Sequence, residues 1–451
     1  MLIHGVKNMV QNHAKIFNNL KNKIENRTVI VGIVGLGYVG LPLAVEKAKA
    51  GFQVIGIEKN PVRADKVNQA DNYIGDVRDQ ELTDVVRSGK LRALTDFEII
   101  SEVDVIVICV PSPLTKNLTP NLIYIEDVTK EIAHRLKPGQ LISLESTTYP
   151  GTTDELMKPI LEEISGFNQG KDFFLAYSPE RVDPGNRHYN TQNTCKIVGA
   201  SDSKSLQVAR LFYQQTIVNI IPVSSAKSAE LAKIFENTFR AVNIALVNEL
   251  AMLCDRLQLN VWEVLDAANT KPFGIMPFYP GPGVGGHCIP LDPHYLEWKA
   301  RELNFNTHFI ALAGEVNRKM PQFVREKTWR VLNHNGIAPS KAHILIIGVA
   351  YKKDVGDWRE SPALEVIDFL LEDGVNLIYH DPYVPNIRVG SRDFSSVELT
   401  DVTISTADLV LITTDHSQID YINLVEKAQA VLDTRGVTRK LDCNKERVTL
   451  L

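Results

Sequence analysis

The sequence predicts an α/β protein with two doubly wound parallel sheets, joined by a long central helix and a small helical domain. Three observations support this prediction. β-branched runs of strand length alternate with helical stretches near the start of the chain, the same alternation returns near its end, and a long helical pattern lies between them. The chain has 451 residues, which exceeds one ordinary core, and its 44% hydrophobic residues are typical of globular domains.

The first sheet is preceded by residues 1–27, which place apolar side chains at helical spacing and predict a helical extension that only covers a neighbouring surface. The expected strands of the sheet are 28–34, 53–57, 104–110 and 140–145, and the expected helices are 41–50, one from about residue 61, and 125–136. Because strands that alternate with helices form parallel sheets, this order predicts a doubly wound domain over residues 28–222.

The central segment, residues 224–257, carries a long helical pattern with no proline or glycine from Ala226 onward. Its apolar residues exceed what one face requires, so we expect it to pack against both neighbouring domains or against a second subunit. This helix opens a central helical and dimerisation domain that we expect at residues 223–320.

The last domain, expected at residues 321–451, repeats the order of the first. Strand 343–348 is followed by Ser361, a typical helix N-cap, by a helix over 363–372 and by strand 375–380. The runs 407–414 and 428–434 resemble 103–110 and 139–145. This similarity indicates two duplicated nucleotide-binding folds.

A glycine-rich turn, formed by Gly35, Gly37 and Gly40, lies between the first strand and the first helix. The glycines permit a tight turn and a close backbone approach, so a pyrophosphate can lie on the helix N-terminus. Glu58 ends the next strand, where its carboxylate would accept from both ribose hydroxyls of NAD and repel the 2′-phosphate of NADP. Arg63 lies close by in the sequence, and its positive charge would weaken this preference for NAD over NADP. This context predicts a Rossmann-like NAD site, against the alternative that the glycines serve the turn alone.

The least ordinary stretch is the segment 279–293, YPGPGVGGHCIPLDP, whose glycines and prolines predict a shaped loop. A thiol at Cys288 can approach a ligand there with little crowding, and backbone N–H groups can stabilise its thiolate or an oxyanion. Asp292 is close enough in sequence to act on water in the same site. Taken alone, Cys288 is equally compatible with a buried core residue, whereas a metal pair of His287 and Cys288 is disfavoured because no further ligands cluster nearby.

Composition excludes several classes of protein. The net charge is −5, with basic and acidic residues interspersed, so no long-range field favours nucleic acid or an anionic membrane. No apolar run approaches the roughly 20 residues that cross a bilayer, and residues 1–27 lack the apolar stretch of a secretory signal. The 5 cysteines include no CxxC pair, and Cys109 and Cys254 are expected in the core. We therefore expect a cytoplasmic protein in a reducing compartment, without a metal site.

Six motifs occur along the chain in one order: GLGYVGLPLA (35–44), STTYPGT (146–152), YSPERVDPG (177–185), Lys233 with Asn237, GVGGHCIPLD (283–292), and YKKD with RES (351–361). Together they resemble the UDP-glucose/GDP-mannose dehydrogenase family, from about residue 28 to the end. The resemblance implies a four-electron oxidation of a sugar C6 hydroxyl to a carboxylate, in which two NAD are reduced and a cysteine carries first a thiohemiacetal and then a thioester.

The sequence of residues 273–293 is similar to that of the UDP-N-acetylhexosamine 6-dehydrogenases within this family. It favours UDP-N-acetyl-D-glucosamine as the substrate, with UDP-N-acetylgalactosamine, UDP-N-acetylmannosamine and UDP-glucose as alternatives. The resemblance also implies a role in polysaccharide biosynthesis and a homodimer or higher homo-oligomer.

The resemblance assigns roles to individual residues. Cys288 is the implied nucleophile, Lys233 is implied to stabilise the alkoxide, and Asn237 is implied to help form the oxyanion site. Asp292 together with Lys233 is implied to manage the proton and the hydrolytic water. Thr148 is implied to position that water, and Glu180 to assist thioester hydrolysis. The implied cofactor-binding residues are Gly35, Gly37, Tyr38, Val39, Gly40, Glu58, Arg63, Pro111, Ser112, Thr148 and Arg359. The implied substrate-binding residues are Glu180, Arg181, Val182, Lys233, Asn237, Tyr279, Gly281, Gly283, Gly285, Lys352 and Arg435.

Two other classes of protein compete with this interpretation. Tyr295 and Lys299 match the Tyr-x-x-x-Lys pair of short-chain reductases, but that class expects a TGxxGxxG turn and a single domain. A non-catalytic nucleotide-sugar binding module would not require Cys288, Lys233, Asn237 and Asp292 together, because binding alone needs no nucleophile.

Overall fold

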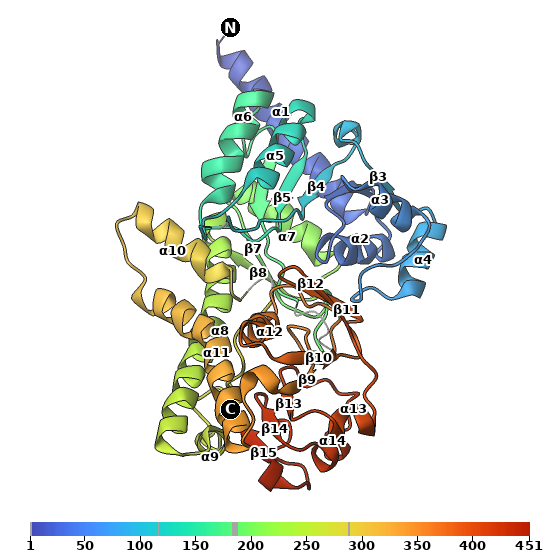
Figure 1. Ribbon diagram of the computed structural model, residues 1–451. Helices are drawn as coiled ribbons and strands as arrows, with labels where there is room; N and C mark the ends of the chain where they lie inside the picture. The colour runs from blue at the N-terminus through green and yellow to red at the C-terminus, as the bar shows by residue number, and fades with distance from the viewer. Residues whose placement is uncertain (1, 116, 183–187, 287–288) are drawn as a thin grey trace. The chain divides into compact units, whose positions relative to one another are not determined.

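The computed structural model describes residues 2–115, 117–182, 188–286 and 289–451, with side chains from residue 13 onward (Figure 1). The chain divides into two compact units. The first unit contains residues 1–236 and 301–303, and the second contains residues 237–300 and 304–451. Helix α8, Ala226–Leu257, begins in the first unit and ends in the second, and it confirms the long helix expected from the sequence.

The first unit contains one eight-stranded sheet with the strand order β3-β2-β1-β4-β5-β6-β7-β8. Neighbouring strands are parallel except β6 and β7. The strands are β1 (Ile30–Val34), β2 (Gln53–Ile57), β3 (Leu91–Leu94), β4 (Val105–Ile108), β5 (Leu141–Leu144), β6 (Phe174–Tyr177), β7 (Lys196–Gly199) and β8 (Ile220–Val223). The helices before α8 are α1 (Leu2–Glu25), α2 (Gly40–Lys49), α3 (Pro61–Asn68), α4 (Asp79–Arg87), η1 (Glu98–Ser101), α5 (Ile123–Arg135), the π-helical η2 (Thr152–Met157), α6 (Lys158–Ser165) and α7 (Ser203–Gln214).

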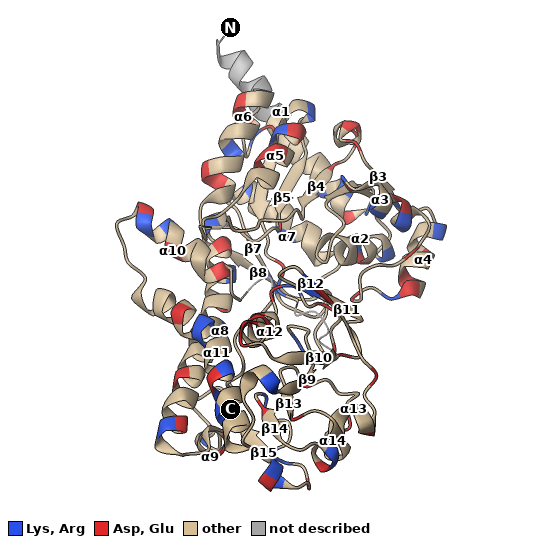
Figure 2. Ribbon diagram, in the orientation of Figure 1, with Lys and Arg blue, Asp and Glu red and all other residues tan. Residues whose placement is uncertain are grey.

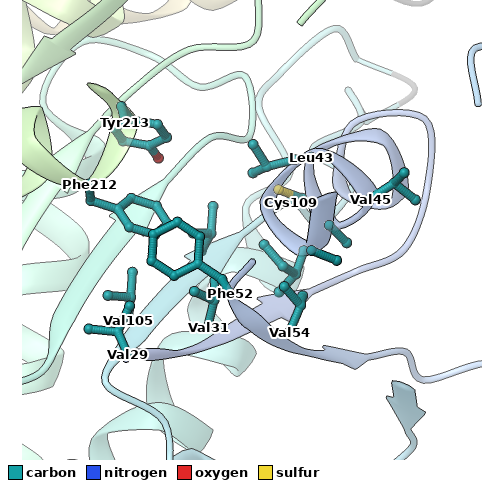
Figure 3. Close-up of a cluster of buried hydrophobic side chains, with 14 of the residues drawn as sticks. Val29, Val31, Leu43, Val45, Phe52, Val54, Val105, Cys109, Phe212 and Tyr213 are labelled. Carbon is teal, nitrogen blue, oxygen red and sulfur yellow. The ribbon is translucent and has the colours of Figure 1, made fainter. Parts of the chain in front are cut away.

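Each face of this sheet is covered by its own apolar core, because successive side chains of a strand point to opposite faces. On one face, Val31 and Val105 pack with residues of α1, α2 and α7. Figure 3 shows part of this core, where the rings of Phe52 and Phe212 lie side by side above the strands. On the other face, Ile106 and Ile108 pack with residues of α5 and α6. Burial on both faces explains why the strands read as continuous apolar runs.

Helix α1 is attached to the first unit through the side chains of its C-terminal half. Leu20 and Ile24 are buried in the first core, with Ile16 and Phe17 packed against it. Lys23 Nζ lies 2.6 Å from Asp104 Oδ1, and Asp104 also accepts from the Ile30 backbone N–H. The helix therefore contacts the beginning of both central strands, β1 and β4.

The sequence did not predict β3, α4 or the three strands β6, β7 and β8 at the end of the sheet. The strand β3 alternates between buried and exposed positions over only four residues. The strands β6, β7 and β8 are also four residues each. Such short runs show no clear period, and pairing with a neighbouring strand decides their conformation.

The second unit contains a parallel five-stranded sheet with the order β10-β9-β13-β14-β15 and a separate antiparallel pair, β11 and β12. The strands are β9 (His343–Ile347), β10 (Asn376–His380), β11 (Asn386–Val389), β12 (Arg392–Ser395), β13 (Leu409–Ile412), β14 (Val431–Asp433) and β15 (Val448–Leu450). The helices are α9 (Val261–Asn269), α10 (Asp292–Glu302), α11 (His308–His334), η3 (Pro339–Lys341), α12 (Pro362–Glu372), α13 (Asp401–Ser405), α14 (Tyr421–Lys427) and η4 (Lys445–Arg447).

The fold class expected from the sequence is confirmed, because both sheets place their strands in the same order. Strand β1 lies between β2 and β4, and β9 lies between β10 and β13. Residues of α11 and α12 cover one face of the second sheet, and residues of α13 and α14 cover the other. The Ser361 side chain accepts from the Ala363 backbone N–H, so Ser361 is the N-cap of α12.

Charged residues of both signs are mixed along the helices of each unit (Figure 2). Among the described helices, none combines the length and the apolar composition required to cross a membrane.

Candidate active site

Each of the three glycines in the turn after β1 has a different structural role. Gly35 has φ +89°, and a Cβ added to it would lie 2.6 Å from the Cys109 carbonyl oxygen. A Cβ at Gly40 would lie 1.8 Å from the Gly35 oxygen. A Cβ at Gly37 would meet no atom within 4 Å. The first and third glycines are therefore required by the protein's own backbone, and the second leaves the backbone open to a ligand.

The same turn leaves the N-terminus of α2 able to receive an anion. The N-cap residue, Val39, makes no side-chain capping hydrogen bond, so the first N–H groups of the helix are not capped by it. An uncapped helix N-terminus favours negative charge through its N–H groups and its dipole. With the open backbone at Gly37, this turn fits the pyrophosphate of NAD.

Glu58 lies at the end of β2 and is 7% exposed. Its Oε2 accepts from the Leu36 N–H and its Oε1 from the Asn60 N–H, both at 3.0 Å. Tyr73 donates to the Leu36 carbonyl oxygen at 2.7 Å, and burial raises its pKa to about 12. Glu58 therefore holds the glycine-rich turn, a function that the sequence did not indicate. Its contact with the NAD ribose stays a prediction.

The other predicted cofactor residues of the first unit lie around the same edge. Pro111 and Ser112 follow β4, which pairs directly with β1. Tyr38 is exposed in the turn, and Arg63 lies over the Tyr73 ring, 5.9 Å from its centroid. The carboxyl ends of β1, β2 and β4 therefore bring these residues together.

The loop after β5 contains Thr148, which is fully buried. Its hydroxyl lies 2.5 Å from the hydroxyl of Thr152. The Ser146 hydroxyl donates to the Val110 carbonyl oxygen at 2.7 Å, which ties the loop to the end of β4. Thr148 is therefore placed by a hydrogen bond inside its own loop.

Glu180 follows β6 and is held by both of its oxygens. Oε1 accepts from the N–H groups of Arg181 and Val182, both at 2.7 Å. Oε2 lies 3.7 Å from Lys196 Nζ. The predicted substrate residue Arg181 forms an ion pair with Glu236, with 2.6 Å between Nη2 and Oε1.

A buried network beneath Glu180 was missed by the sequence interpretation. Lys196 Nζ donates to Glu145 Oε2 at 2.9 Å, and the Tyr213 hydroxyl donates to Glu145 Oε1 at 2.7 Å. Burial raises the pKa of Glu145. Burial alone would lower the pKa of Lys196, but the charges of Glu145 and Glu180 outweigh it and raise that pKa. A lysine that opens the apolar run 196–199 was the available signal for this network.

Two predicted catalytic residues that are 55 positions apart lie together in the second unit. Asn237 Nδ2 donates to Asp292 Oδ2 at 2.5 Å. Asp292 begins α10 and is 2% exposed, so the amide holds a buried carboxylate. Lys233 is half-buried and lies one turn before Asn237 on α8. This spacing places Lys233 and Asn237 on the same face of the helix.

Three glycines of the glycine-rich loop lie close to other residues of the second unit. A Cβ at Gly285 would lie 2.7 Å from the Glu360 oxygen, and one at Gly286 would lie 2.9 Å from the Tyr351 ring. A Cβ at Gly283 would lie 2.9 Å from the Pro362 side chain. A larger residue would not fit at these positions, because other residues of the protein fill the adjacent space. Cys288, the predicted nucleophile, and His287 lie outside the described residues.

The beginning of this loop packs against residues of α9 and of the C-terminal sheet. The Tyr279 ring stacks on Trp262 with 5.6 Å between centroids, and its hydroxyl donates to Asp266 Oδ1 at 2.9 Å. A Cβ at Gly281 would lie 2.6 Å from the Arg435 guanidinium, so these two predicted substrate residues are in contact.

The remaining predicted residues follow strands of the second sheet. Lys352 follows β9 and Arg435 follows β14, so both lie at the carboxyl edge of that sheet. Arg435 Nε donates to Asp415 Oδ1 at 3.3 Å. Arg359 is exposed and pairs with Asp357, with 2.7 Å between Nη2 and Oδ2.

The core positions predicted for Cys109 and Cys254 are confirmed by the structure. Cys109 is 8% exposed and belongs to the first core, where Figure 3 labels it together with Leu43, and burial raises the pKa of its thiol. Cys254 is buried in the apolar cluster around Trp262.

Three family models match this chain in sequence: the NAD binding domain of the UDP-glucose/GDP-mannose dehydrogenase family at residues 29–217, its central domain at residues 227–319, and its UDP binding domain at residues 345–440. The chain belongs to the UDP-glucose/GDP-mannose dehydrogenase family. This UDP-sugar dehydrogenase is 35% identical over 394 residues to the UDP-N-acetyl-D-mannosamine dehydrogenase of Pyrococcus horikoshii, covering 87% of this chain and 91% of the relative.

A second relative of the dehydrogenase is the UDP-N-acetyl-D-glucosamine 6-dehydrogenase of Salmonella typhi, which is 33% identical over 391 residues and covers 86% of this chain and 90% of the relative. A solved structure of the NDP-N-acetyl-D-galactosaminuronic acid dehydrogenase from Methanosarcina mazei Go1 matches with a TM-score of 0.80 and 30% identity, covering 96% of this chain and 97% of that one. The dehydrogenase is therefore an NAD-dependent oxidoreductase, and the short-chain reductase alternative fails; Tyr295, its required acid or base, is 1% exposed.

Proposed function

We propose that this dehydrogenase oxidises the C6 hydroxyl of a UDP-N-acetylhexosamine to a carboxylate. The observation that carries the proposal is the buried pair of Asn237 and Asp292, which a module for binding alone would not need. The relatives described above are all named for sugars with an N-acetylated amino group, which favours such a sugar over UDP-glucose.

The proposed reaction has four chemical steps. The C6 alcohol loses a hydride and a proton and becomes an aldehyde. The thiol of Cys288 adds to the aldehyde carbon, and its proton passes to the oxygen, which gives a thiohemiacetal. Loss of a second hydride and a second proton leaves a thioester. Water then cleaves the C–S bond, which yields the carboxylate and restores the thiol.

NAD, when bound at the glycine-rich turn, accepts the hydride. Gly35, Gly37, Val39 and Gly40 would hold its pyrophosphate, and Glu58 its ribose, because Gly37 is open and the carboxylate is already oriented. We assign Tyr38, Arg63, Pro111, Ser112, Thr148 and Arg359 to the same cofactor.

The roles of the polar groups follow from their charge and position. Lys233 stabilises the negative oxygen that develops as the alcohol loses its proton, and the Asn237 amide donates to the oxyanion. Asp292 takes a proton from the attacking water, since its carboxylate is buried and held by Asn237. Glu180 assists the hydrolysis of the thioester, and Thr148 positions the water. Lys352 and Arg435 bind the diphosphate with charged donors.

Among the UDP-N-acetylhexosamines, we propose UDP-N-acetyl-D-glucosamine as the substrate, on the basis of the sequence of residues 273–293. The galacto and manno isomers differ from it at one stereocentre each. We further propose a cytoplasmic homodimer or higher homo-oligomer, supported by exposed apolar side chains on α8 such as Leu246 and Leu253. Analytical ultracentrifugation tests the oligomer: a monomer at micromolar concentration would contradict it.

The function is tested by NADH release with UDP-N-acetylglucosamine, UDP-N-acetylgalactosamine, UDP-N-acetylmannosamine and UDP-glucose. We expect two NADH for each sugar consumed, with an N-acetylated sugar as the best substrate. One NADH for each sugar would mean a simple alcohol dehydrogenase. Faster turnover of UDP-glucose than of all three N-acetylated sugars would overturn the proposed substrate class.

The nucleophile is tested by Cys288→Ser, with Cys443→Ser as the matched control. We expect Cys288→Ser to lower the second oxidation and thioester formation by at least about 100-fold, because a hydroxyl is a weaker nucleophile than a thiolate. Binding of the UDP-sugar, measured by calorimetry, should be retained. Cys443→Ser should turn over as the wild type does, and unchanged turnover in Cys288→Ser would refute the assignment.

A further inference from the structure

Glu230 is a buried carboxylate in the first two turns of α8 that the proposed reaction does not use. It is 0% exposed. Its Oε2 accepts from the Gly151 backbone N–H at 2.5 Å. Its Oε1 accepts from the Thr153 backbone N–H at 2.8 Å and from the Thr153 hydroxyl at 2.6 Å. Three donors from one loop therefore converge on one side chain.

These donors belong to the loop that contains Thr148. Gly151 has φ +112° and is the N-cap of η2, so its N–H and that of Thr153 lie where a helix leaves backbone donors without partners. Thr152, between them, makes the hydrogen bond to Thr148. The Glu230 carboxylate therefore holds the segment that places Thr148.

The same side chain fixes this loop against a particular turn of α8. Glu230 and Lys233 are three residues apart on the helix, and residues with this spacing lie on one face. Removal of the hydrogen bonds of Glu230 would let the Thr148 loop move relative to the turn that carries Lys233. Both groups belong to the first unit.

Burial brings the titration of Glu230 close to neutral pH. Burial raises the pKa of Glu230 to about 7, although hydrogen bonds from Thr153 and Gly151 favour the ionised form and Asp154 disfavours it. On η2, Asp154 accepts from the Ser201 hydroxyl, and Glu155 pairs with Lys227 of α8 at 3.0 Å. Among the described residues, no cationic side chain is paired with Glu230 to hold its charge.

We propose that Glu230 is a positioning residue whose ionised carboxylate clamps the loop 148–153 to α8 in the arrangement used for turnover. Protonation places a hydrogen on an oxygen that now accepts from the loop, so the hydrogen bond from Gly151 or those from Thr153 weaken. The clamp is therefore closed above neutral pH and loosened below it. This inference rests on the proposed function only for the kinetic test, which measures turnover of the UDP-sugar.

The kinetic test compares Glu230→Gln with the wild type between pH 6 and 8, at saturating NAD and UDP-sugar. We expect the wild-type kcat to fall about tenfold toward pH 6, with a midpoint near 7, because one hydrogen bond to a charged group is lost. Glu230→Gln, which carries no charge, should have the low kcat at both ends of this range. The KM for NAD should change less than about twofold, since the glycine-rich turn is untouched.

Glu163→Gln is the matched control, because Glu163 is an exposed carboxylate on α6 in the same unit. It should reproduce the wild-type profile. If Glu230→Gln keeps the wild-type rise in kcat from pH 6 to 8, the clamp is refuted.

Hydrogen exchange gives a readout that does not depend on turnover. At pH 8, the amides of residues 146–157 should exchange at least about fivefold faster in Glu230→Gln than in the wild type, while those of β1 are unchanged. If the wild type forms no NADH with any UDP-sugar, the proposed function fails and the exchange still decides the clamp. If NADH forms normally and the exchange of residues 146–157 is unaltered in Glu230→Gln, only the clamp fails.

Discussion

The turns that follow β1 and β9 have the same framework but are filled differently. In the first unit a Cβ at Gly35 would approach the carbonyl oxygen of Cys109, after β4; in the second, a Cβ at Gly348 would lie 2.5 Å from the carbonyl oxygen of Thr414, after β13. Glu58 at the end of β2 accepts from the Leu36 N–H, and Asp381 at the end of β10 accepts from the N–H groups after Gly348. An acid that holds a turn is common to both halves.

The difference lies in what surrounds that acid. In the first turn the helix begins at Gly40 and the backbone at Gly37 is open. In the second, α12 begins only at Pro362, and Asp381 is buried against His416, with 3.0 Å between Oδ2 and Nε2. His416 Nδ1 accepts from the Asp354 N–H, so the ring proton lies on Nε2 and is donated to Asp381.

The comparison shows how one framework can serve two anionic ligands. An open turn with an uncapped helix offers backbone N–H groups to a pyrophosphate. A turn filled by buried side chains cannot do so, and we propose that lysines and arginines of the second unit bind the ligand there instead.

The largest expected difference is between the two acids. We expect Asp381→Ala to lower the free energy of unfolding of the second unit by about 3–5 kcal/mol, because it leaves His416 and four backbone N–H groups buried without an acceptor. Glu58→Ala should cost the first unit about 1–2 kcal/mol, since it removes two hydrogen bonds.

Denaturant unfolding can separate these effects, because all 4 tryptophans lie in the second unit. Tryptophan fluorescence should show the loss in Asp381→Ala, and far-UV circular dichroism with hydrogen exchange of β1 should show the loss in Glu58→Ala. Equal losses would mean that the buried histidine adds nothing to the second turn.

The next difference concerns the pH dependence of stability. The pKa of Glu230 in the folded state, about 7, lies above its ordinary value of 4.5, because burial of the charge costs more than the hydrogen bonds from the loop return. Ionisation therefore strengthens the hydrogen bonds of the clamp but lowers the free energy of unfolding of the protein as a whole. The free energy of unfolding should therefore fall by about 2–3 kcal/mol as the pH rises from about 4.5 to about 7, and this fall should be absent in Glu230→Gln.

Asp381 should act with the opposite sign. Burial alone would raise the pKa of Asp381, but hydrogen bonds from His416 and the backbone outweigh it and hold the pKa below 3.8. Its stabilisation is thus present above about pH 4 and is lost as the pH falls below that value. Urea unfolding from pH 3 to 8 measures the contributions of Glu230 and Asp381, with Glu163→Gln as the control. The expectation for Glu230 would be contradicted if the free energy of unfolding of the wild type rose from pH 5 to 7 and matched that of Glu230→Gln.

The smallest expected effects come from the glycines. Gly348→Ala should destabilise the second unit by about 1–2 kcal/mol, because φ is +80° and the Cβ meets a backbone oxygen. Gly37→Ala should leave stability within about 0.5 kcal/mol but weaken NAD binding about tenfold, since its methyl would stand where the ligand approaches. Calorimetric titration with NAD checks this; equal affinities in Gly37→Ala and the wild type would show that the pyrophosphate lies elsewhere.

Much of the first half could be predicted from sequence because its signals are local. The β-branched run, the three glycines and the acid after β2 stand within 31 residues of one another, at residues 28–58. The doubly wound class of both sheets followed from the alternation of elements and from the similarity of residues 103–110 to residues 407–414. The motifs also selected Asn237 and Asp292, which the structure places in contact.

The partnerships of buried polar groups could not be predicted in this way. Glu145, Lys196 and Tyr213 come from different elements, and no spacing along the chain links them. The same holds for Glu230 with Gly151, and for Asp381 with His416. The neighbours of Gly283, Gly285 and Gly286, which are Pro362, Glu360 and Tyr351, could not be predicted either.

The sequence by itself determined the class of fold, the nucleotide-binding turn and the family to which the chain belongs, because hydrophobic period and turn composition are local properties of the chain. Only the tertiary structure decided which buried charges are paired and which loop each one holds. A carboxylate inside a protein takes its pKa and its function from donors that may be hundreds of residues away, and these donors meet only when the sheets and helices have packed.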